Sequence, residues 1–375
     1  MNLYCVRFKK EFHNWTSGNN DIDKFIQQMQ LHAKKYNEII EWIPFNKFTN
    51  IEYLSRGGFG VVYKATWTDG YIYGFNSHKN AWKRSSQMNV CLKRLYNSND
   101  INKDFLEEVK NQHKYGGDSS IAIYGITKNP QDNDYTMVMQ YAKKGSLRKL
   151  LDSRYHMLNW ICKIDNLRYI SQGLRAIHKA KLVHKDLHSG NIVNQSYFDP
   201  YITDFGLCKP VSQDSGSKEF FGVLPYVAPE LLKALFNGDN IVYTQESDIY
   251  SFGIIMSEII NGYPPYYDFP HNTDLALKIL EGQRPEIKCE VPQLLLDLMN
   301  RCLDDKPKNR PYAKELVDRL KQYQYDITNE KTELYKQIKA IKTEKFPAPL
   351  IYKIHEQASY KSQNLSKTLK NFQGY

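Results

Sequence analysis

Apolar residues recur at helical spacing near the N-terminus and at strand spacing in the segment that follows. Between residues 20 and 43 they return every three or four positions, which predicts an amphipathic helix that stops at Pro44. From residue 51 to residue 95, short runs of β-branched and aromatic residues alternate with Gly-containing polar turns, a pattern typical of strands. The elements expected between residues 51 and 141 are strands at 51–54, 61–66, 90–93, 121–126 and 136–141, and a helix at 105–114.

After Gly145 the pattern becomes mostly helical. Further helices are expected at 247–260, 273–280 and 292–302, and glycines stand just beyond two of them, at 262 and 282, where helices commonly end. One apolar stripe consists of Ile164, Leu167, Ile170, Leu174 and Ile177. The predicted fold class is therefore α+β, with a small antiparallel β-rich N-lobe that carries one key helix and a larger, mainly α-helical C-lobe.

Composition sets further limits. The chain has 375 residues, of which 41% are hydrophobic and 25% charged, so it can bury a large core. Its six cysteines are scattered without CxxC spacing, which favours reduced thiols over a zinc or disulfide framework. Because the sequence has neither a long apolar run nor a signal-peptide pattern, we expect a cytoplasmic protein without a membrane span, for which access to the nucleus stays open.

The formal net charge of +10 is unevenly spread, since residues 321–375 carry ten lysines and five acidic residues. Such a tail can contact a membrane or a nucleic acid. However, Lys and Arg form no compact cluster with interleaved aromatic residues, so a solvated and loosely ordered surface explains the tail more simply. We therefore expect no specific nucleic-acid partner.

A glycine-rich segment, Ser55–Val62, lies between two expected strands. Glycines let backbone N–H groups approach phosphate oxygens without interference from a Cβ atom. A glycine-rich hairpin turn explains the segment equally well. Strands on both sides argue against a dinucleotide-binding or Walker-type loop, in which a helix follows the glycines.

Lys93 lies in the apolar strand candidate at 90–93. A lysine in such a strand loses hydration unless it meets a negative partner. A phosphate together with the carboxylate of Glu108, on the next expected helix, would provide that partner. The alternative is that Lys93 is an ordinary edge-strand lysine.

The most specific pattern is a polar loop, Val183–Asn191, followed by the triplet Asp204-Phe205-Gly206. Asp186, Asn191 and Asp204 supply three oxygen ligands on short loops that follow apolar segments. Carboxylate and amide oxygens are the ligands that hard cations such as Mg²⁺ prefer. The two motifs therefore predict a magnesium site.

Taken together, these motifs resemble the signature set of the eukaryotic protein kinases. The resemblance covers residues 51–322 in the correct order. The residues of several motifs resemble those of the tyrosine-kinase-like group. Together with the segment Trp15–Asn19, these motifs are similar to the expanded kinase-like proteins of fungi. The other motifs that carry the resemblance are Ala228-Pro229-Glu230, Ser247–Gly253, Gly282–Pro285 and Lys308–Pro311.

The resemblance implies a protein-kinase-like two-lobe fold that binds ATP with Mg²⁺. The domain boundaries that we expect are an N-terminal helical extension at 1–50, an N-lobe at 51–142, a C-lobe at 143–322 and a basic tail at 323–375 that is partly helical or disordered. The implied activity is transfer of the γ-phosphoryl group of ATP to Ser or Thr hydroxyls of protein substrates. A catalytically weak or inactive pseudokinase, acting as a nucleotide-binding signalling scaffold, is the alternative. Residues 1–50 and 323–375 are candidate contact regions for a regulatory protein.

The resemblance also assigns roles to individual residues. Asp186 would orient the substrate hydroxyl and accept its proton, Lys93 paired with Glu108 would hold the α- and β-phosphates, and Asn191 and Asp204 would hold Mg²⁺. Met139 looks like the gatekeeper residue. The residues expected to contact the nucleotide are Leu54, Ser55, Gly57, Gly58, Phe59, Gly60, Val62, Lys93, Met139, Gln140, Tyr141 and Ala142. The residues with implied structural roles are His184 and Phe205 in the spine, the ion pair Glu230–Arg310 and the loop anchor Asp248.

Several positions depart from the kinase pattern. Ser55 replaces the first glycine of the glycine-rich segment, and Gln112 stands where an apolar spine residue is usual. Lys185 replaces the arginine before Asp186 and loses the bidentate fork that would clamp a loop phosphorylated at Ser212, Ser215 or Ser217. His188 takes the place of the lysine that serine/threonine kinases carry two residues after the catalytic aspartate, and we count it with the catalytic group. Val223 stands where threonine is usual, and Gly190 where a tyrosine kinase carries arginine, so neither specificity signature is complete.

Overall fold

The short apolar runs in the first part of the chain form a mostly antiparallel sheet. The structure is a computed structural model, and it divides the chain into two units, residues 1–114 with 121–142 and residues 115–120 with 143–375. It describes residues 3–56, 60–95, 103–115, 121–131, 134–210, 220–341 and 352–369.

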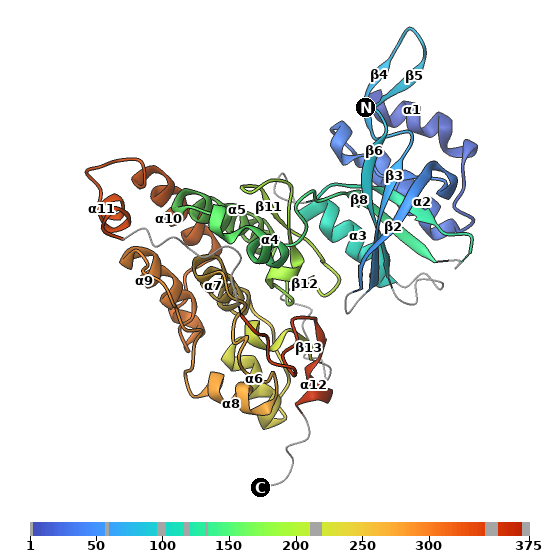
Figure 1. Cartoon of the computed structure of the whole chain (residues 1–375). Helices are drawn as coiled ribbons and strands as arrows, with labels where there is room; N and C mark the ends of the chain where they lie inside the picture. Colours follow the sequence, from blue (N-terminus) through green and yellow to red (C-terminus); the bar gives the residue numbers. More distant parts are fainter. Residues whose placement is uncertain are drawn as a thin grey trace. The chain divides into compact units, whose positions relative to one another are not determined.

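The first unit is built on a six-stranded sheet with the strand order β1-β7-β8-β6-β3-β2, in which only the β1–β7 pair is parallel (Figure 1). The strands and the helix expected between residues 51 and 141 are confirmed. A separate hairpin, β4–β5, was not expected from the sequence. The elements of this unit are α1 (Leu3–Glu11), α2 (Asn20–His32), β1 (Glu41–Trp42), β2 (Phe48–Arg56), β3 (Gly60–Trp67), β4 (Ile72–Asn76), β5 (Ala81–Arg84), β6 (Met88–Leu95), α3 (Lys103–Tyr115), β7 (Ile123–Lys128) and β8 (Tyr135–Gln140).

The helix expected over residues 20–43 is correct only for its first half. The helix α2 ends at His32, because Ala33 has an extended backbone with a ψ of 128°. Residues 41 and 42 instead form β1, which pairs with Gly125 and Ile126 of β7. A Cβ atom at Gly125 would lie 2.1 Å from the carbonyl oxygen of Glu41, so this close approach requires glycine. The apolar spacing therefore continued past the helix into a strand.

The segment Trp15–Asn19 caps the start of α2. The Asn19 side chain accepts hydrogen bonds from the backbone N–H groups of Asp21 (2.8 Å) and Ile22 (3.3 Å). The Thr16 hydroxyl donates to the Asp23 carboxylate (2.6 Å), which also accepts the Ser17 backbone N–H (2.8 Å). These contacts satisfy N–H groups that the first turn of a helix leaves without intrahelical partners.

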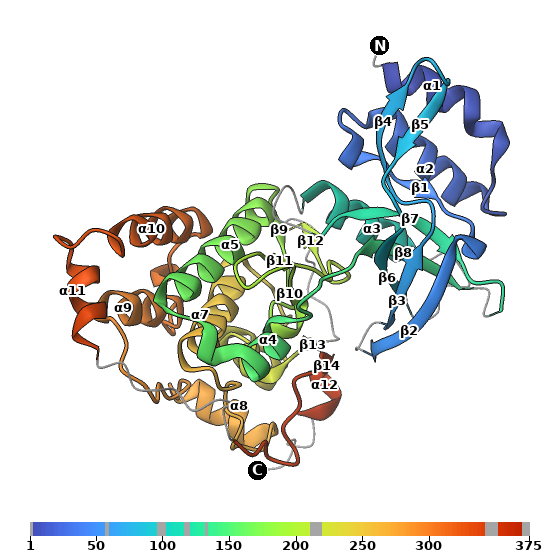
Figure 2. The same ribbon diagram turned by 45° about the horizontal axis from the view of Figure 1, so that its top comes forward.

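The helix α1 packs against the β4–β5 hairpin (Figure 2). The Phe8 and Trp82 rings stack with centroids 4.6 Å apart, and the Trp82 indole N–H donates to the carboxylate of Glu11 (2.9 Å). The guanidinium of Arg7 lies 3.2 Å from the centroid of the Phe75 ring. The N-terminal extension is therefore attached to the first unit by aromatic and charged contacts as well as by β1.

The extension also contacts the helix α3. The His113 imidazole Nε2 donates a hydrogen bond to the carbonyl oxygen of Glu38, at 2.9 Å. Burial lowers the pKa of His113, and the Glu38 carbonyl offsets this only in part, so the imidazole is neutral near pH 7. Because α3 also carries Glu108, this contact ties the extension to the helix with the predicted lysine partner.

The second unit is mainly helical and is organised around α7, whose residues are almost all buried. The helices expected at 247–260, 273–280 and 292–302 are confirmed. The Thr244–Ser247 capping box starts α7, and Gly262 ends it with a φ of +82°. The elements of this unit are α4 (Leu147–Arg154), α5 (Trp160–Lys179), β9 (Leu182–Val183), β10 (Ile192–Asn194), β11 (Pro200–Ile202), β12 (Lys209–Pro210), β13 (Phe221–Gly222), α6 (Pro229–Asn237), α7 (Gln245–Asn261), α8 (Thr273–Leu280), α9 (Gln293–Cys302), α10 (Ala313–Asp326), α11 (Glu333–Ala340), β14 (Gln363–Asn364) and α12 (Leu365–Thr368).

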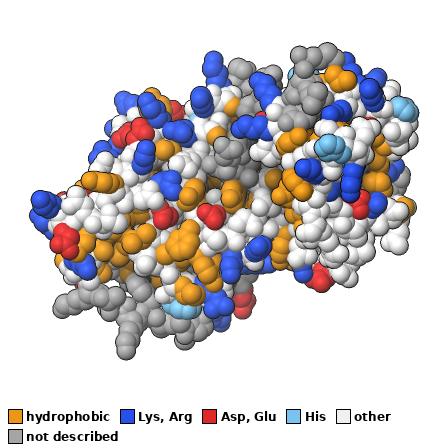
Figure 3. Space-filling view, turned by 90° about the horizontal axis from the view of Figure 1, so that it is seen from above, with side chains coloured by type: hydrophobic (Ala, Val, Ile, Leu, Met, Phe, Trp, Pro, Cys, Tyr) orange, Lys and Arg blue, Asp and Glu red, His pale blue; other side chains and the backbone are white. Residues whose placement is uncertain are grey.

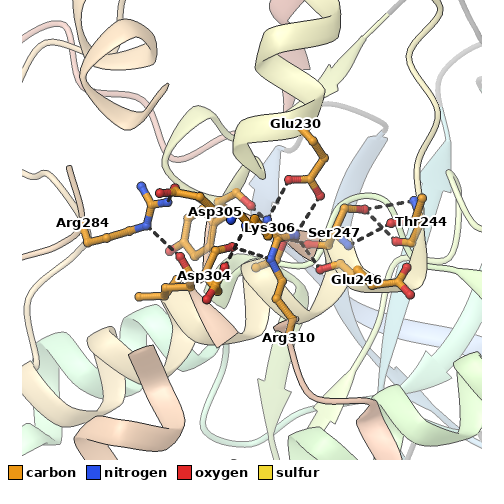
Figure 4. A network of polar contacts seen from close by, with 12 residues as sticks. Glu230, Thr244, Glu246, Ser247, Arg284, Asp304, Asp305, Lys306 and Arg310 are labelled. Atoms are coloured by element: carbon orange, nitrogen blue, oxygen red, sulfur yellow. Dashed lines mark hydrogen bonds and ion pairs between the residues drawn. The ribbon is translucent and has the colours of Figure 1, made fainter. Parts of the chain in front are cut away.

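A bidentate ion pair connects α6 to the segment before α10 (Figure 4). Two nitrogens of the Arg310 guanidinium each lie 2.7 Å from an oxygen of the Glu230 carboxylate. Arg310 also donates to the backbone carbonyls of Asp304 (2.9 Å) and Glu246 (3.0 Å). The ion pair predicted from the sequence is thus present, and its arginine side chain is fully buried.

Residues 352–369, which we call the C-terminal strap, lie on the second unit, and their strand β14 pairs with β13 (Figure 1). On the face drawn in Figure 3, Lys and Arg side chains are scattered among acidic and apolar ones. No helix in the described part of the chain is long and apolar enough to span a bilayer.

Replacement of Arg310 by lysine tests the ion pair. We expect Arg310→Lys to lower the free energy of unfolding by about 3 kcal/mol, because an ammonium keeps the charge but cannot make the bidentate contact in a buried site. Urea denaturation monitored by tryptophan fluorescence measures this change. The matched control is Arg301→Lys, whose exposed pair with Glu315 is worth about 1 kcal/mol or less. Equal stability losses in the two variants would contradict the assignment.

The contact between His113 and Glu38 predicts a pH-dependent stability. Since burial places the pKa of folded His113 below its unfolded value of about 6.5, the stabilisation is complete above that pH and is lost as the pH falls through the folded pKa. In His113→Gln a donor remains but the titration is gone. Melting temperatures should therefore fall more steeply on acidification in the wild type than in this variant. The control is His78→Gln, at an exposed turn, and parallel profiles for wild type and His113→Gln would exclude the effect.

Candidate active site

In the first unit, Lys93 and Glu108 form the buried ion pair that the sequence predicted. The Lys93 ammonium donates to the Glu108 carboxylate at 2.7 Å, and both side chains are less than one tenth exposed. Lys93 lies in β6, where its Cα neighbours are Val62 of β3 and Met137 of β8. A central strand thus holds the lysine and α3 supplies the carboxylate, so the alternative of an edge-strand lysine is wrong.

The glycine-rich segment joins β2 to β3. Ser55 pairs with Val62 in the antiparallel ladder and has an extended backbone, so serine fits where a glycine was expected. Leu54 lies beside it in β2, and Gly60 starts β3. The predicted positions Gly57, Gly58 and Phe59 lie outside the described residues.

The predicted gatekeeper and hinge residues lie at the end of β8. Met139 is buried, and its Cα neighbours are Cys91 of β6 and Ile123 of β7. Gln140 is the last residue of β8, and its backbone N–H donates to the carbonyl of Ala122 at 2.9 Å. Tyr141 and Ala142 follow it, and both are partly exposed. The first unit therefore contains a lysine–carboxylate pair and, after the end of the neighbouring strand β8, a peptide segment that is not fully buried.

In the second unit, Asp186 is nearly buried and is held by Asn191. The Asn191 amide nitrogen donates to the Asp186 backbone carbonyl (2.9 Å) and to its carboxylate Oδ2 (3.2 Å). The His184 Nε2–H donates to the Thr203 carbonyl (3.2 Å), which leaves Nδ1 to accept the Asp186 backbone N–H (3.3 Å). Hydrogen bonds thus hold both the backbone and the side chain of Asp186.

The loop that carries Asp186 is anchored by Asp248 of α7. The Asp248 carboxylate accepts the backbone N–H groups of His184 (2.8 Å) and Lys185 (3.1 Å), and it lies 3.0 Å from Nε2 of His178. Lys185 has a φ of +73°, which costs a non-glycine residue roughly 1–2 kcal/mol. The predicted anchor is therefore confirmed, and it offsets local backbone strain.

The two predicted metal ligands meet at one end of the β10–β11 hairpin. Asn191 directly precedes β10, and Asp204 follows β11 by two residues. The Thr203 backbone N–H donates to the Asn191 carbonyl at 2.9 Å, which fixes this end of the hairpin. Since the Asn191 amide nitrogen donates to Asp186, its Oδ1 is the atom suited to a cation. One carboxylate and one amide oxygen fit Mg²⁺, which takes few protein ligands and completes its shell with phosphate oxygens and water.

Phe205, the residue after Asp204, packs against His184. The two rings make an edge contact with centroids 5.6 Å apart, and both side chains are buried. This is the contact that the predicted spine roles require.

His188 lies beside Asp186, at the position where lysine was expected. Its Nδ1 accepts the Gly190 backbone N–H (3.1 Å), so the proton of the neutral ring is on Nε2, which lies 3.7 Å from Oδ2 of Asp186. A Cβ atom at Gly190 would lie 2.7 Å from the His188 ring, so a larger residue does not fit there. The two departures from the kinase pattern, His188 and Gly190, are therefore physically coupled.

Val223 lines the same small cavity as Asp186 and His188. Its buried isopropyl group cannot make the hydrogen bond that a threonine would provide there. The predicted loop phosphorylation sites Ser212, Ser215 and Ser217 lie outside the described residues.

A buried polar network behind the loop was not predicted. The Tyr226 hydroxyl donates to Glu258 (2.7 Å), the Ser189 hydroxyl also donates to Glu258 (3.1 Å), and Arg148 pairs with the same carboxylate (2.8 Å). Burial, together with the Glu258 charge, raises the pKa of Tyr226 well above its ordinary value, so the phenol stays protonated. The only sequence signal for this network is a glutamate within the otherwise apolar run of α7.

Comparison with known proteins agrees with this geometry. A sequence model of the family described as protein tyrosine and serine/threonine kinase matches residues 48–320. A probable serine/threonine-protein kinase of Dictyostelium discoideum is 29% identical over 76% of the chain and 16% of its own length. The tyrosine-protein kinase SPK-1 of Girardia tigrina is 30% identical over 70% of the chain and 51% of its own length. The human receptor-interacting serine/threonine-protein kinase 4 is 28% identical over 71% of the chain and 30% of its own length.

The chain thus spans about half or less of the length of these relatives. The family match itself covers both the lysine–carboxylate pair and the loop of Asp186. The chain belongs to the protein tyrosine and serine/threonine kinase family.

Proposed function

We propose that the chain is an ATP-dependent protein kinase that transfers the γ-phosphoryl group to Ser or Thr hydroxyls of protein substrates. The observation that carries this proposal is the geometry around Asp186, whose carboxylate is held by the Asn191 amide on a loop anchored by Asp248. A carboxylate fixed in this way is suited to orient a hydroxyl and to accept its proton.

The remaining roles follow from the charges in the two units. Lys93, paired with Glu108, binds the α- and β-phosphates of ATP through the positive charge of its ammonium group. Asn191 and Asp204 hold Mg²⁺, which supplies positive charge that neutralises the phosphate oxygens. Phosphoryl transfer depends mainly on such alignment and charge neutralisation.

The adenine site that we propose uses apolar and backbone groups of the first unit. Leu54 and Val62 contact the base from β2 and β3, and Met139 closes the site at its inner end. The backbone groups of Gln140, Tyr141 and Ala142 make the polar contacts to the base, and Ser55 and Gly57–Gly60 contact the phosphates. These are the positions that the family resemblance assigns to the nucleotide, with Ser55 in place of the first glycine.

The preference for Ser or Thr over Tyr has two supports. Gly190 stands where a tyrosine kinase carries arginine, and the His188 ring leaves no room for even a Cβ atom there. Several relatives are named serine/threonine-protein kinases. The substitutions His188 and Val223 remove an ammonium charge and a hydroxyl group near Asp186, so we expect a slow enzyme.

The alternative function is a nucleotide-binding scaffold without phosphoryl transfer. Three substitutions favour the scaffold, because each replaces a side chain that kinases normally use. They are His188, Val223 and Lys185. Four residues favour an active enzyme, because a scaffold does not need all of them. They are Lys93, Asp186, Asn191 and Asp204. The protein is proposed to act in the cytoplasm, and regulatory proteins are proposed to bind through residues 1–50 or 323–375.

Replacement of Asp186 separates the two functions. Asp186→Asn keeps the shape but removes the base, so we expect phosphate transfer to a generic protein substrate to fall by about 10²–10⁴-fold while ATP·Mg binding persists. Transfer of radiolabelled phosphate and equilibrium binding of a nucleotide analogue measure the two effects. The control is Asp318→Asn on the exposed face of α10, which should change neither. A wild type no faster than Asp186→Asn would favour the scaffold.

Replacement of His188 by lysine tests the missing donor. We expect His188→Lys to raise kcat by about tenfold or more, because a permanent positive charge near the transferred group stabilises the transition state. The loss of the Gly190 contact should lower stability by only about 1 kcal/mol. A steady-state kinase assay gives kcat, with His156→Lys at an exposed position as the control. A rate equal to or below that of the wild type would refute this account.

A further inference from the structure

The C-terminal strap, residues 352–369, is attached to the second unit along its length. At its start, the Tyr352 ring makes edge contacts with Tyr263 and Tyr267, with centroids 5.6 and 5.3 Å apart, and its hydroxyl donates to Asp152. The backbone N–H of His355 donates to the Tyr267 carbonyl at 2.8 Å. The start of the strap is therefore fixed to the segment after α7 by both aromatic and backbone contacts.

The middle of the strap is fixed by His271. The His271 Nε2 lies 3.2 Å from the Tyr266 carbonyl oxygen, and its Nδ1 lies 3.0 Å from the backbone nitrogen and 2.9 Å from the carbonyl oxygen of Ser359. The ring also contacts Tyr360 edge-on, with centroids 4.9 Å apart. The Tyr360 hydroxyl donates to the Pro265 carbonyl at 2.9 Å, so this part of the strap has specific partners.

The end of the strap joins the segment that precedes Val223. Strand β14 pairs with β13 in antiparallel register, and Figure 2 shows the two strands side by side. The backbone N–H of Leu365 donates to the Phe220 carbonyl (2.7 Å), and the Phe220 N–H donates to the Ser366 hydroxyl (3.0 Å). Both backbone groups of Phe220, a fully buried residue, thus find partners in the strap.

These contacts are strong enough to determine the conformation of the segment they touch. Leu365 and Leu369 are buried in the same core cluster as Phe220 and Val223. Burial of the two leucine side chains stabilises the contact. A buried backbone group that loses its hydrogen-bond partner is destabilising. Without the strap, the segment Phe220–Val223 would therefore lose much of what holds it in place.

The segment Phe220–Val223 lies next to the proposed catalytic aspartate. Phe221, Gly222 and Val223 line the same small cavity as Asp186. Among the described residues that line this cavity, none comes from the strap. The strap therefore supports the wall of the cavity from behind and does not fill it.

Lys185 shows why such support matters in this chain. Its ammonium lies 4.8 Å from the centroid of the Tyr243 ring, and the Tyr243 hydroxyl donates to the Phe221 carbonyl at 3.0 Å. A lysine cannot make the bidentate contact with a phosphate that arginine makes. Contacts that need no phosphate thus converge on Phe221 from Tyr243 and from the strap.

We propose that the C-terminal strap is a built-in activating element, which holds Phe220–Val223 in the conformation needed for protein substrates. It takes over the role that a phosphorylated loop residue would otherwise have. This inference rests on the proposed kinase function. Phosphorylation of the loop should accordingly add little to the activity.

The test uses the full chain with Leu365→Asp, which places a charge in the buried contact. We expect amide hydrogen exchange of residues 220–226 to accelerate, and kcat/KM for a peptide substrate to fall, each by about tenfold or more. Affinity for an ATP analogue should stay unchanged, because the strap contacts named above are all made with residues of the second unit. Ser366→Ala, which removes the acceptor of the Phe220 N–H, should act in the same direction to a smaller extent and guards against misfolding of the first variant.

The matched control is Lys367→Asp, which introduces the same charge two residues along at an exposed position and should leave exchange and kinetics unchanged. A higher kcat/KM in Leu365→Asp would show that the strap inhibits, and an unchanged value would show that it does not regulate; either result overturns the inference. Exchange does not depend on catalysis. If the wild type is no more active than Asp186→Asn, the proposed kinase function fails. Separately, unchanged amide hydrogen exchange in Leu365→Asp overturns the positioning role of the strap.

Discussion

The chemistry of the second unit depends on one buried carboxylate, that of Asp248. It accepts two consecutive backbone N–H groups, those of His184 and Lys185, and so sets the path of the loop just before Asp186. It can do this because α7 is buried along almost its whole length and is itself held by a capping box at Thr244. Since the loop contains a residue in the left-handed region, it would relax to another conformation without that anchor. The position of the proposed base is thus determined by packing far from the reacting atoms.

The substitutions around Asp186 depend on one another. The His188 ring accepts a hydrogen bond from the Gly190 backbone N–H, and a Cβ atom at Gly190 would lie too close to that ring. The residues at these two positions therefore depend on each other. Val223 completes an environment with fewer hydrogen-bonding groups than the family motif has. In a residue-by-residue comparison with the kinase motif, His188, Gly190 and Val223 look like independent departures from it. In the structure they are neighbours that form one connected set around Asp186.

Much of the fold and the site could be predicted from the sequence where a pattern has a single physical explanation. A lysine in an apolar central strand needs a carboxylate, and Lys93 has Glu108. The Glu230–Arg310 pair and the Asp248 anchor were implied by the resemblance to the protein kinases. The helix expected over residues 20–43 failed beyond His32, because apolar spacing does not record where a chain leaves a helix to pair with a strand 80 residues away. The network of Glu258 and the strap were missed for the same reason: both depend on contacts between residues far apart in sequence, which no local pattern encodes.

The short strand β1 has a consequence beyond the attachment of the N-terminal extension. It occupies the edge of the sheet at β7, where backbone N–H and C=O groups would otherwise be open to pairing with another chain. The absence of a side chain at Gly125 lets the backbone of Glu41 lie close against this edge. A fragment begun after Trp42, at the boundary suggested by the family match, would uncover that edge. Such a fragment would be prone to aggregation, even though every residue of the matched region would still be present.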